Sequence, residues 1–481
     1  MTPAKGRPAA FILVAVLIIV MLSSMVVVSL LFRVRAEETA TVAGAGSQQA
    51  WAAAMSGVQE AIRIAAGAAP GDLSWQEDVA AFRERLVVDE GSERWYFSVY
   101  GESGSDHDGL RFGLEDEGSK LNLNEATEEM LEKLPRMTPY LVQSLLDFVD
   151  SDDTPRPEGA EQEYYDTLVN PYNVFNHPLD SVEQLLLVRG FTPALLYGED
   201  ANWNYQLDAN EDDAELQFPP DNKDGRLDLG LRPYLSVWSY DLDQANDGSP
   251  RIPLNDYSDA TITNAISAGE EFPAPLVAYI EALRRNNLKL EHPADLLEAK
   301  TKFKGEGAKE ETLESGVGKS ELSLVLDRFT TSTTERQPGL VNINTASAVV
   351  LRTLPGIDEA LADAIVAARR NLRAEQRRTT AWLYQEGLMD AVQFKKTSPY
   401  LTARSFQFHL QVVGYGLPSG RYRVLEAVID VAGKQPAIAY LRDITRLGLP
   451  FAIEARHDGD TSEPSTTAAA RRPRSFWLPH G

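Results

Sequence analysis

The chain has 481 residues, enough for about three domains of ordinary size. Its formal charge is −25, from 46 Lys and Arg against 71 Asp and Glu, and a polyanion of this charge repels nucleic acid. Cysteine is absent, which excludes disulfide scaffolds, thiolate zinc sites and cysteine nucleophiles. The six histidines are widely separated and form no metal-hydrolase motif.

An uncharged apolar stretch covers residues 9–32 and follows a short leader at residues 1–8. As a helix it would span about 36 Å, enough to cross the hydrocarbon core of a bilayer. The alternative is a secretory signal peptide cleaved near Ala43-Gly44-Ala45. The apolar region of a signal peptide is usually only about 7–15 residues long, so we expect a retained, single-pass transmembrane helix.

The helical pattern continues beyond the membrane segment. Residues 36–69 are Ala-rich, with larger apolar residues at mostly three- and four-residue spacings, and Pro70-Gly71 ends the pattern. A second short helix is predicted around residues 78–87. Strand patterns then occur at both ends of the remaining chain, at residues 94–100, 110–114, 406–412, 421–431 and 437–444.

These patterns predict an α+β fold in which one antiparallel sheet is interrupted by a large insertion. In chain order, we predict the long helix and first strands at 33–116, an α-helical insertion at 117–404, the remaining strands at 405–450, and a flexible tail at 451–481.

The insertion contains a repeat with an offset of 220 residues, at 120–150 and 340–370. Each copy places two asparagines before a helix pattern that ends in Leu-Pro, which predicts a helix-hairpin-helix unit of the SAM-like kind. The second asparagine, Asn124 or Asn344, is predicted to cap the first helix. The identical positions are Asn122/Asn342, Asn124/Asn344, Ala126/Ala346, Leu131/Leu351, Leu134/Leu354 and Pro135/Pro355.

Helix-hairpin-helix units often bind the DNA backbone through a glycine-built turn. The second copy has Gly356, but Asp358 follows and would face a phosphate; the first copy has Arg136 instead of glycine. We therefore expect structural hairpins and no nucleic acid. The alternative is a membrane-anchored DNA-binding protein of a competence or uptake type, which would use the basic run Arg369, Arg370, Arg373, Arg377 and Arg378.

Acidic loops cover residues 205–260. Alternating Asp and Asn in turns can offer several hard oxygens to one cation, as calcium requires. Neither stretch completes an EF-hand loop, and the alternative is an acidic surface loop with Asx-turns. The candidate calcium ligands are Asp208, Asn210, Asp212, Asp221, Asp224 and Asp228.

No motif predicts an enzyme. Gly316-Val-Gly-Lys319-Ser320 lacks the first glycine of a phosphate loop. No nucleophile elbow is present. A hydrolase with a carboxylate pair remains an alternative, but the sequence nominates no pair.

The combined motifs resemble a known family. They are the apolar helix that runs into an Ala-rich one, the twin motifs Leu121-Asn-Leu-Asn-Glu-Ala-Thr and Val341-Asn-Ile-Asn-Thr-Ala-Ser, and the segment 150–190 with Pro157-Glu-Gly-Ala-Glu161 and Tyr164-Tyr165. Together they resemble the K-type minor pseudopilins of bacterial type II secretion (the GspK family). The resemblance implies a pilin-like fold, interrupted by a large α-helical domain.

The resemblance also implies a non-enzymatic role at the tip of the secretion pseudopilus, capping it and helping to start its assembly. Implied partners are the I- and J-type minor pseudopilins, the major pseudopilin and the inner-membrane secretion platform. The implied location is the bacterial inner membrane, with the large C-terminal part in the periplasm, where family members bind calcium. Prepilin peptidase would cleave between Gly6 and Arg7, which leaves Phe11 at the fifth mature position, where most pseudopilins have Glu.

Overall fold

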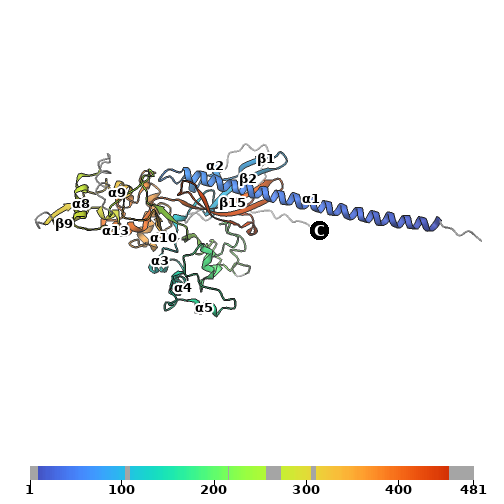
Figure 1. Cartoon of the computed structure of the whole chain (residues 1–481), viewed down its shortest axis with the longest axis horizontal. Coiled ribbons are helices and arrows are strands. Elements are labelled where there is room, and N and C mark those ends of the chain that lie inside the picture. The colour runs from blue at the N-terminus through green and yellow to red at the C-terminus, as the bar shows by residue number, and fades with distance from the viewer. Residues whose placement is uncertain (1–8, 103–108, 215, 256–271, 305–309, 454–481) are drawn as a thin grey trace, which may run out of the picture. The chain divides into compact units, whose positions relative to one another are not determined.

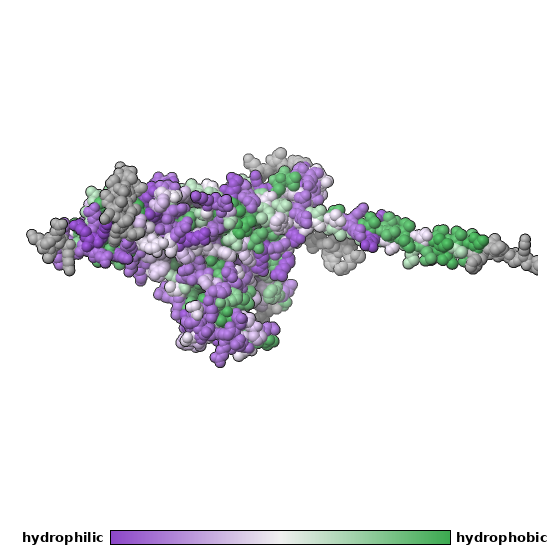
Figure 2. Space-filling model, in the orientation of Figure 1, coloured by the Kyte–Doolittle hydropathy of each residue, from purple (hydrophilic) through white to green (hydrophobic). Residues whose placement is uncertain are grey.

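The computed structural model describes residues 9–102, 109–214, 216–255, 272–304 and 310–453. Helix α1 runs without interruption over Ala9–Gly67. Apolar side chains are exposed along its N-terminal half (Figure 2), and it is the one helix in the described ranges that is long and apolar enough to cross a membrane. The helix therefore fits a single membrane anchor.

The C-terminal half of α1 packs on an antiparallel sheet through small side chains (Figure 1). Ala54, Val58 and Ala61 are fully buried there. The backbones approach closely: a Cβ on Gly414 would lie 2.2 Å from the carbonyl oxygen of Ala50. Glycine at this position is what allows the sheet to contact the helix.

The sheet is the one expected from the two ends of the chain. Its strand order is β1-β2-β15-β16-β17, with β3 paired to β2 and β4 paired to β15. The bounds are β1 Arg85–Asp89, β2 Arg94–Glu102, β3 Leu110–Arg111, β4 Glu115–Asp116, β15 Gln407–Leu417, β16 Tyr422–Asp430 and β17 Ala437–Asp443. The α+β fold class, with a pilin-like helix and sheet interrupted by an insertion, is confirmed.

Two local predictions are wrong. The helix predicted over residues 78–87 is only α2, Val79–Phe82, capped by Asp78; the following Leu86, Val87 and Val88 belong to β1, because tertiary pairing with β2 overrides a weak local helix signal. Strand β15 continues to Leu417, beyond the predicted end at residue 412, and Gly414 within this extension lies against α1.

The insertion between β4 and β15 has its own hydrophobic core. Its α-helices are α3 Glu128–Glu132, α4 Pro139–Val149, α5 Gln162–Asp166, α6 Pro193–Tyr197, α8 Ala274–Arg285, α9 Leu322–Arg328, α10 Ala348–Thr353, α11 Glu359–Arg369, α12 Trp382–Gln385 and α13 Ala391–Thr397. Its strands are β5 Leu121–Asn122, β6 Leu235–Ser236, β7 Tyr240–Leu242, β8 Ile252–Pro253, β9 Lys300–Lys304, β10 Glu310–Glu314, β11 Phe329–Thr330, β12 Arg336–Pro338, β13 Val341–Asn342 and β14 Leu401–Thr402. The 3-10 helices in the described residues are η1 Ser74–Gln76, η2 Glu117–Ser119, η3 Val182–Leu187, η4 Arg232–Tyr234, η5 Pro293–Leu296, η6 Gln376–Arg378, η7 Ser398–Tyr400 and η8 Thr445–Leu447.

The second repeat lies at the C-terminal end of α1, far along the helix from its exposed apolar half (Figure 1). A Cβ on Gly71, just after α1, would lie 2.1 Å from the carbonyl oxygen of Ala374. One pocket is lined both by the end of α1 and by Asn342 and Ala403 of the insertion. The insertion therefore contacts this end of the helix, where Ala66 and Gly67 remain exposed.

Candidate functional site

The two repeats adopt the same local structure. Each starts with a two-residue strand that pairs in parallel with a later strand: β5 with β6 and β13 with β14. The side-chain oxygen of Asn122 accepts a hydrogen bond from the Asn124 amide at 3.0 Å, and Asn342 accepts one from Asn344 at the same distance. The first asparagine of each copy therefore shapes the turn before the helix.

The predicted cap position is wrong. Thr127 caps α3 and Ser347 caps α10. The side chain of Asn124 instead binds a segment that is distant in the sequence. Its amide group donates a hydrogen bond to the Leu179 carbonyl and accepts one from the Leu179 N–H. Asn344 donates to backbone carbonyls of later segments of the insertion.

The hairpin turns follow the buried leucines Leu134 and Leu354. Pro135 and Pro355 come next, and the third residue of each turn adopts a left-handed backbone conformation. Gly356 has φ +86°, and Arg136 has φ +60° in the first copy. Both copies thus make the same turn, although only the second has glycine, which adopts this backbone conformation without strain.

Helix α13 covers the second turn. Thr397 donates from its hydroxyl to the carbonyl of Pro355, and Gln393 donates from its amide to the carbonyl of Gly356, both at 2.9 Å. A Cβ on Gly356 would lie 2.5 Å from the Thr397 hydroxyl oxygen. Two carbonyl groups of this turn are therefore bound by α13, and Pro355 and Gly356 are half-buried.

Two arginines of the basic run at the end of α11 are also used internally, whereas Arg370, Arg373 and Arg378 are exposed. Arg369 donates from Nη1 to the carbonyl of Ala346 at 2.5 Å, and Arg377 donates to the carbonyl of Arg369 at 3.2 Å. These contacts give no support to the DNA-binding alternative.

Asp116, the last residue of β4, connects the sheet to the second repeat. Its Oδ2 accepts hydrogen bonds from Asn342 at 2.9 Å, Thr345 at 2.5 Å and Ser405 at 2.7 Å. Burial nevertheless raises the pKa of Asp116 to about 6. The repeat asparagine thus joins the insertion to the point where the chain leaves the sheet.

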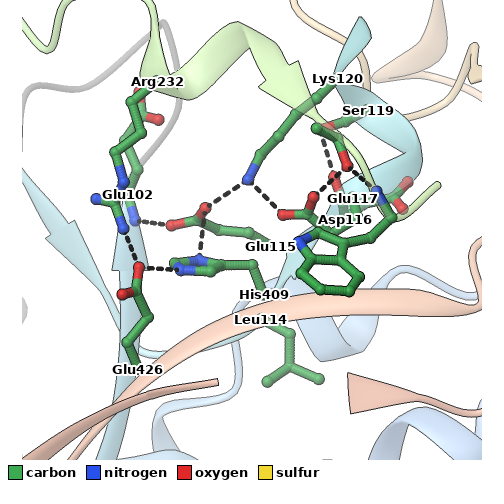
Figure 3. Close-up of polar contacts among 12 residues, drawn as sticks. Glu102, Leu114, Glu115, Asp116, Glu117, Ser119, Lys120, Arg232, His409 and Glu426 are labelled. Carbon is green, nitrogen blue, oxygen red and sulfur yellow. Dashed lines mark hydrogen bonds and ion pairs between the residues drawn. The ribbon is translucent and has the colours of Figure 1, made fainter. Parts of the chain in front are cut away.

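A buried charge network joins the sheet to the insertion beside this point (Figure 3). At its centre His409 of β15 lies between two carboxylates: Nδ1 is 3.1 Å from Glu115 of β4, and Nε2 is 3.1 Å from Glu426 of β16. All three residues are buried. Both ring nitrogens are therefore committed to carboxylates of the sheet.

The insertion contributes the cations of the network (Figure 3). Lys120 Nζ lies 2.7 Å from Glu117 and 3.5 Å from Glu115. Arg232 pairs with Glu426. Glu115 and Glu426 thus each contact both His409 and a cationic side chain of the insertion.

The pKa values follow from these pairs. Burial alone would lower the pKa of His409, but Glu115 and Glu426 outweigh it and raise the pKa to about 9. Burial alone would raise the pKa of Glu426, but Arg232 and His409 lower it to about 2. The pKa of Glu115 is likewise held well below its usual range by His409 and Lys120, against the opposing effect of burial. At neutral pH the network therefore contains an imidazolium between two carboxylates.

This geometry suits a structural ion-pair network that holds the insertion on the sheet, and it does not suit a catalytic site. A general base needs a free nitrogen within reach of a substrate proton, whereas both nitrogens of His409 are occupied and the ring is buried. The network was not predicted. Strand alternation places His409 on the opposite face from Phe408 and Leu410, but no local signal says that the insertion covers that face.

The six predicted calcium ligands do not converge on one point. Asp208 accepts from the side chains of Asn202 and Asn204, and Asp221 accepts from the amides of Asp213, Ala214 and Lys223. Three others bind within the loops: Asn210 donates to the Phe218 carbonyl, Asp212 accepts from the Gly225 amide, and Asp224 accepts from the Arg226 amide. Asp228 instead pairs with Arg136 of the first hairpin turn.

Buried carboxylates that were not predicted support these loops. Glu211 accepts from the amides of Ala201 and Asp208, and burial raises its pKa to about 7. Glu199 accepts from the amides of Asn222 and Asp228, and burial also raises its pKa. These loops are rich in carboxylate and amide oxygens, which are the hard donors that calcium prefers.

The proposed processing site and the tail lie outside the described residues. Gly6 and Arg7 precede the described start of α1, and the side chain of Phe11 is not described. The same holds for most of the flexible tail predicted at 451–481, which is described only through Ile453.

Comparison with known proteins gives two family matches. Residues 116–197 match the model described as "Type II secretion system (T2SS), protein K", and residues 337–377 match the helix-hairpin-helix motif. The first repeat lies within the protein K match, and the second is the helix-hairpin-helix match. Comparison with curated proteins gives no match.

Among solved structures, the chain is similar to one in "The Crystal Structure of the GspK-GspI-GspJ complex from enterotoxigenic Escherichia coli Type 2 Secretion System". The identity is 13% and the TM-score 0.41, with 85% of this chain and 99% of that chain covered. The match of residues 116–197 to the protein K model supports the family resemblance found in the sequence.

Proposed function

We propose that this protein is the K-type minor pseudopilin that caps the tip of a type II secretion pseudopilus and helps to start its assembly for protein export. It is a structural subunit, anchored in the bacterial inner membrane by α1, with the sheet and insertion in the periplasm. Its partners are the I- and J-type minor pseudopilins, the major pseudopilin below them and the inner-membrane platform.

The observation that carries the proposal is the position of the insertion relative to α1. The exposed apolar half of α1 can pack with other apolar helices, whereas the insertion contacts its C-terminal end. A subunit with an insertion at its distal end can have neighbours below it but leaves little room for another subunit above. The buried charge network holds the insertion on the sheet and so helps to keep it at that end.

Complex formation tests the proposal. The full chain in detergent would be mixed with the I- and J-type minor pseudopilins of the same organism, and the mass of each species measured during size-exclusion chromatography. A stoichiometric ternary complex that also recruits the major pseudopilin is the expected result. Elution of the chain alone from every mixture would contradict the proposal.

Calcium binding by the acidic loops is part of the same proposal. Asp208, Asp212 and Asp221, with their neighbours, would offer carboxylate oxygens, and the ion would compensate the negative charge of buried Glu199 and Glu211. The expected result is a higher melting temperature of the full chain in calcium than in chelator. The rise would be smaller in Asp212→Asn, and an equal rise in both proteins would remove these loops from the proposal.

Processing between Gly6 and Arg7 is proposed from the resemblance, with Phe11 then fifth in the mature chain. Intact mass of the protein, expressed with and without prepilin peptidase, would measure it. An unchanged mass would contradict cleavage at this site.

A further inference from the structure

A small cavity lies where the insertion meets the sheet, beside the buried charge network. The sheet contributes Glu102, Glu426 and Tyr440 to its lining, and the insertion contributes Trp203 and Trp238. The cavity has a volume of about 60 Å³. Since one water-sized group needs about 10–15 Å³, the cavity has room for the head of a small polar ligand.

The lining carries more negative than positive charge. Its carboxylates are Glu102, Glu115, Glu117, Glu183, Asp200 and Glu426, and its cationic side chains among the described residues are Lys120, Arg232 and His409. A fourth cation, Arg442, lies outside the lining and pairs with Glu183 at 3.5 Å. Six carboxylates against four cations leave negative charge in excess, so the cavity favours a positively charged ligand.

Four of the six carboxylates are already compensated. The network pairs both Glu115 and Glu117 with Lys120. Asp200 accepts hydrogen bonds from two backbone N–H groups, both at 3.1 Å, and Glu183 has its arginine. The other two carboxylates are compensated only in part.

Glu426 presents one oxygen atom without a partner. The residue is 2% exposed, and its Oε1 binds both His409 and Arg232. Its Oε2 is buried and has no hydrogen-bond partner among the described residues. A buried carboxylate oxygen without a donor is costly, so Oε2 favours a ligand that donates an N–H group.

Glu102 lies at the same end of the network as Glu426 and Arg232 (Figure 3). Its carboxylate makes no ion pair within the described part of the chain, and burial, reinforced by Glu115, raises its pKa to about 7. The nearby Arg111 donates instead to three backbone carbonyls, one of them that of Glu102 itself. A cation in the cavity would therefore stabilise the ionised form of Glu102.

Aromatic rings form part of the cavity wall. Trp203 carries two guanidinium groups, with Arg232 at 4.6 Å and Arg442 at 5.0 Å from the ring centroid. The ring centroids of Trp238 and Tyr440 lie 5.9 Å apart, with the planes tilted by 43°. Aromatic faces attract organic cations, whereas a metal ion needs oxygen ligands on most sides. The wall therefore favours an organic cation.

We propose that this cavity binds an alkylammonium group, whose N–H groups donate to Glu426 and Glu102 and whose carbon chain lies against Trp238 and Tyr440. An ammonium head is smaller than a guanidinium and suits the volume. Two sources carry this group, a free organic amine and the lysine side chain of another protein. The inference uses residues of this chain alone and does not depend on the proposed function.

The experiment is calorimetric titration of the full chain in detergent, at about pH 8 and about 0.15 M salt, which screens non-specific attraction to the acidic surface. The probes are n-butylammonium chloride and the peptide acetyl-Gly-Lys-Gly-amide. One-to-one binding of n-butylammonium is the expected result. Binding of the peptide as well would identify protein lysine as a source, and binding of n-butylammonium alone would identify a free amine. Butan-1-ol, which has the same carbon chain without the charge, should not bind.

Two variants place the ligand in the cavity and leave the ion pairs of His409 intact. Glu102→Gln and Trp238→Leu should each weaken binding at least about fivefold, through the lost charge and the lost aromatic face respectively. Their melting temperatures would show that both fold. The matched control is Glu163→Gln, which removes an exposed carboxylate of α5 outside the cavity and should bind as the wild type does.

The proposal has three clear contradictions. Absence of binding by both probes would overturn it, as would binding of butan-1-ol as tightly as n-butylammonium. Equal affinity in the wild type, Glu102→Gln and Trp238→Leu would also overturn it, because the amine would then bind elsewhere on the acidic surface.

Discussion

The charge state of His409 should make the stability of the protein depend on pH in a predictable direction. Its folded-state pKa is raised from 6.5 to about 9. At about 1.4 kcal/mol for each pH unit, this rise corresponds to about 3 kcal/mol of folding free energy. Because the folded pKa lies above the unfolded one, the stabilisation is complete below pH 6.5 and is lost as the pH rises through 9. At the acid end, Glu426 loses its own contribution below pH 4.5 as the pH falls through 2.

The perturbation is His409→Gln, which keeps a polar side chain but removes the titrating charge between Glu115 and Glu426. Urea unfolding of the full chain in detergent, followed by tryptophan fluorescence, would be measured at pH 6 and pH 9.5. The cost of the substitution should be about 3 kcal/mol larger at pH 6 than at pH 9.5. Other groups also titrate in this range, so the difference between variant and wild type isolates His409.

The control for this experiment is His177→Gln, which removes an exposed histidine. It should change the unfolding free energy by less than about 0.5 kcal/mol at either pH. If His409→Gln costs the same at pH 6 and pH 9.5, then His409 is not an imidazolium in the folded protein, and the account of the network is wrong.

Three further substitutions test the packing, each read as a change in unfolding free energy. Gly356→Ala should cost at least about 1 kcal/mol more than Gly420→Ala, because both residues have positive φ but only the first has a neighbour in the way. Asn342→Ala should cost about 1–3 kcal/mol, since it leaves Asp116 short of a donor, while exposed Asn371→Ala should cost under about 0.5 kcal/mol. Phe408→Ala should cost about 3–5 kcal/mol and exposed Val392→Ala almost nothing. Equal costs within any pair would contradict the corresponding contact.

Predictions from sequence periodicity were most reliable for helices and strands whose structure follows from their own residues. Helix α1 and strands β2, β15, β16 and β17 lie where the patterns predicted them. Leu131 and Leu351, which are identical positions of the repeat, are both buried. In each of these cases, the spacing of apolar residues alone states which face is buried.

Predictions failed where two distant segments compete for one side chain. Asn124 was predicted to cap a helix because it precedes one, but the backbone of Leu179 takes its amide group, and Thr127 caps the helix instead. Strand β1 was predicted as part of a helix, because its pairing partner is not visible in its own residues.

The sequence by itself determined the apolar anchor, the Ala-rich helix, the outline of the sheet and the repeat within the insertion. Each of these features follows from local composition and from the spacing of residues along the chain. Only the tertiary structure decided that His409 lies between Glu115 and Glu426, and that Lys120 and Arg232 reach the same carboxylates. These residues come from separate segments, and a buried charge is stable only where those segments meet to supply its partners.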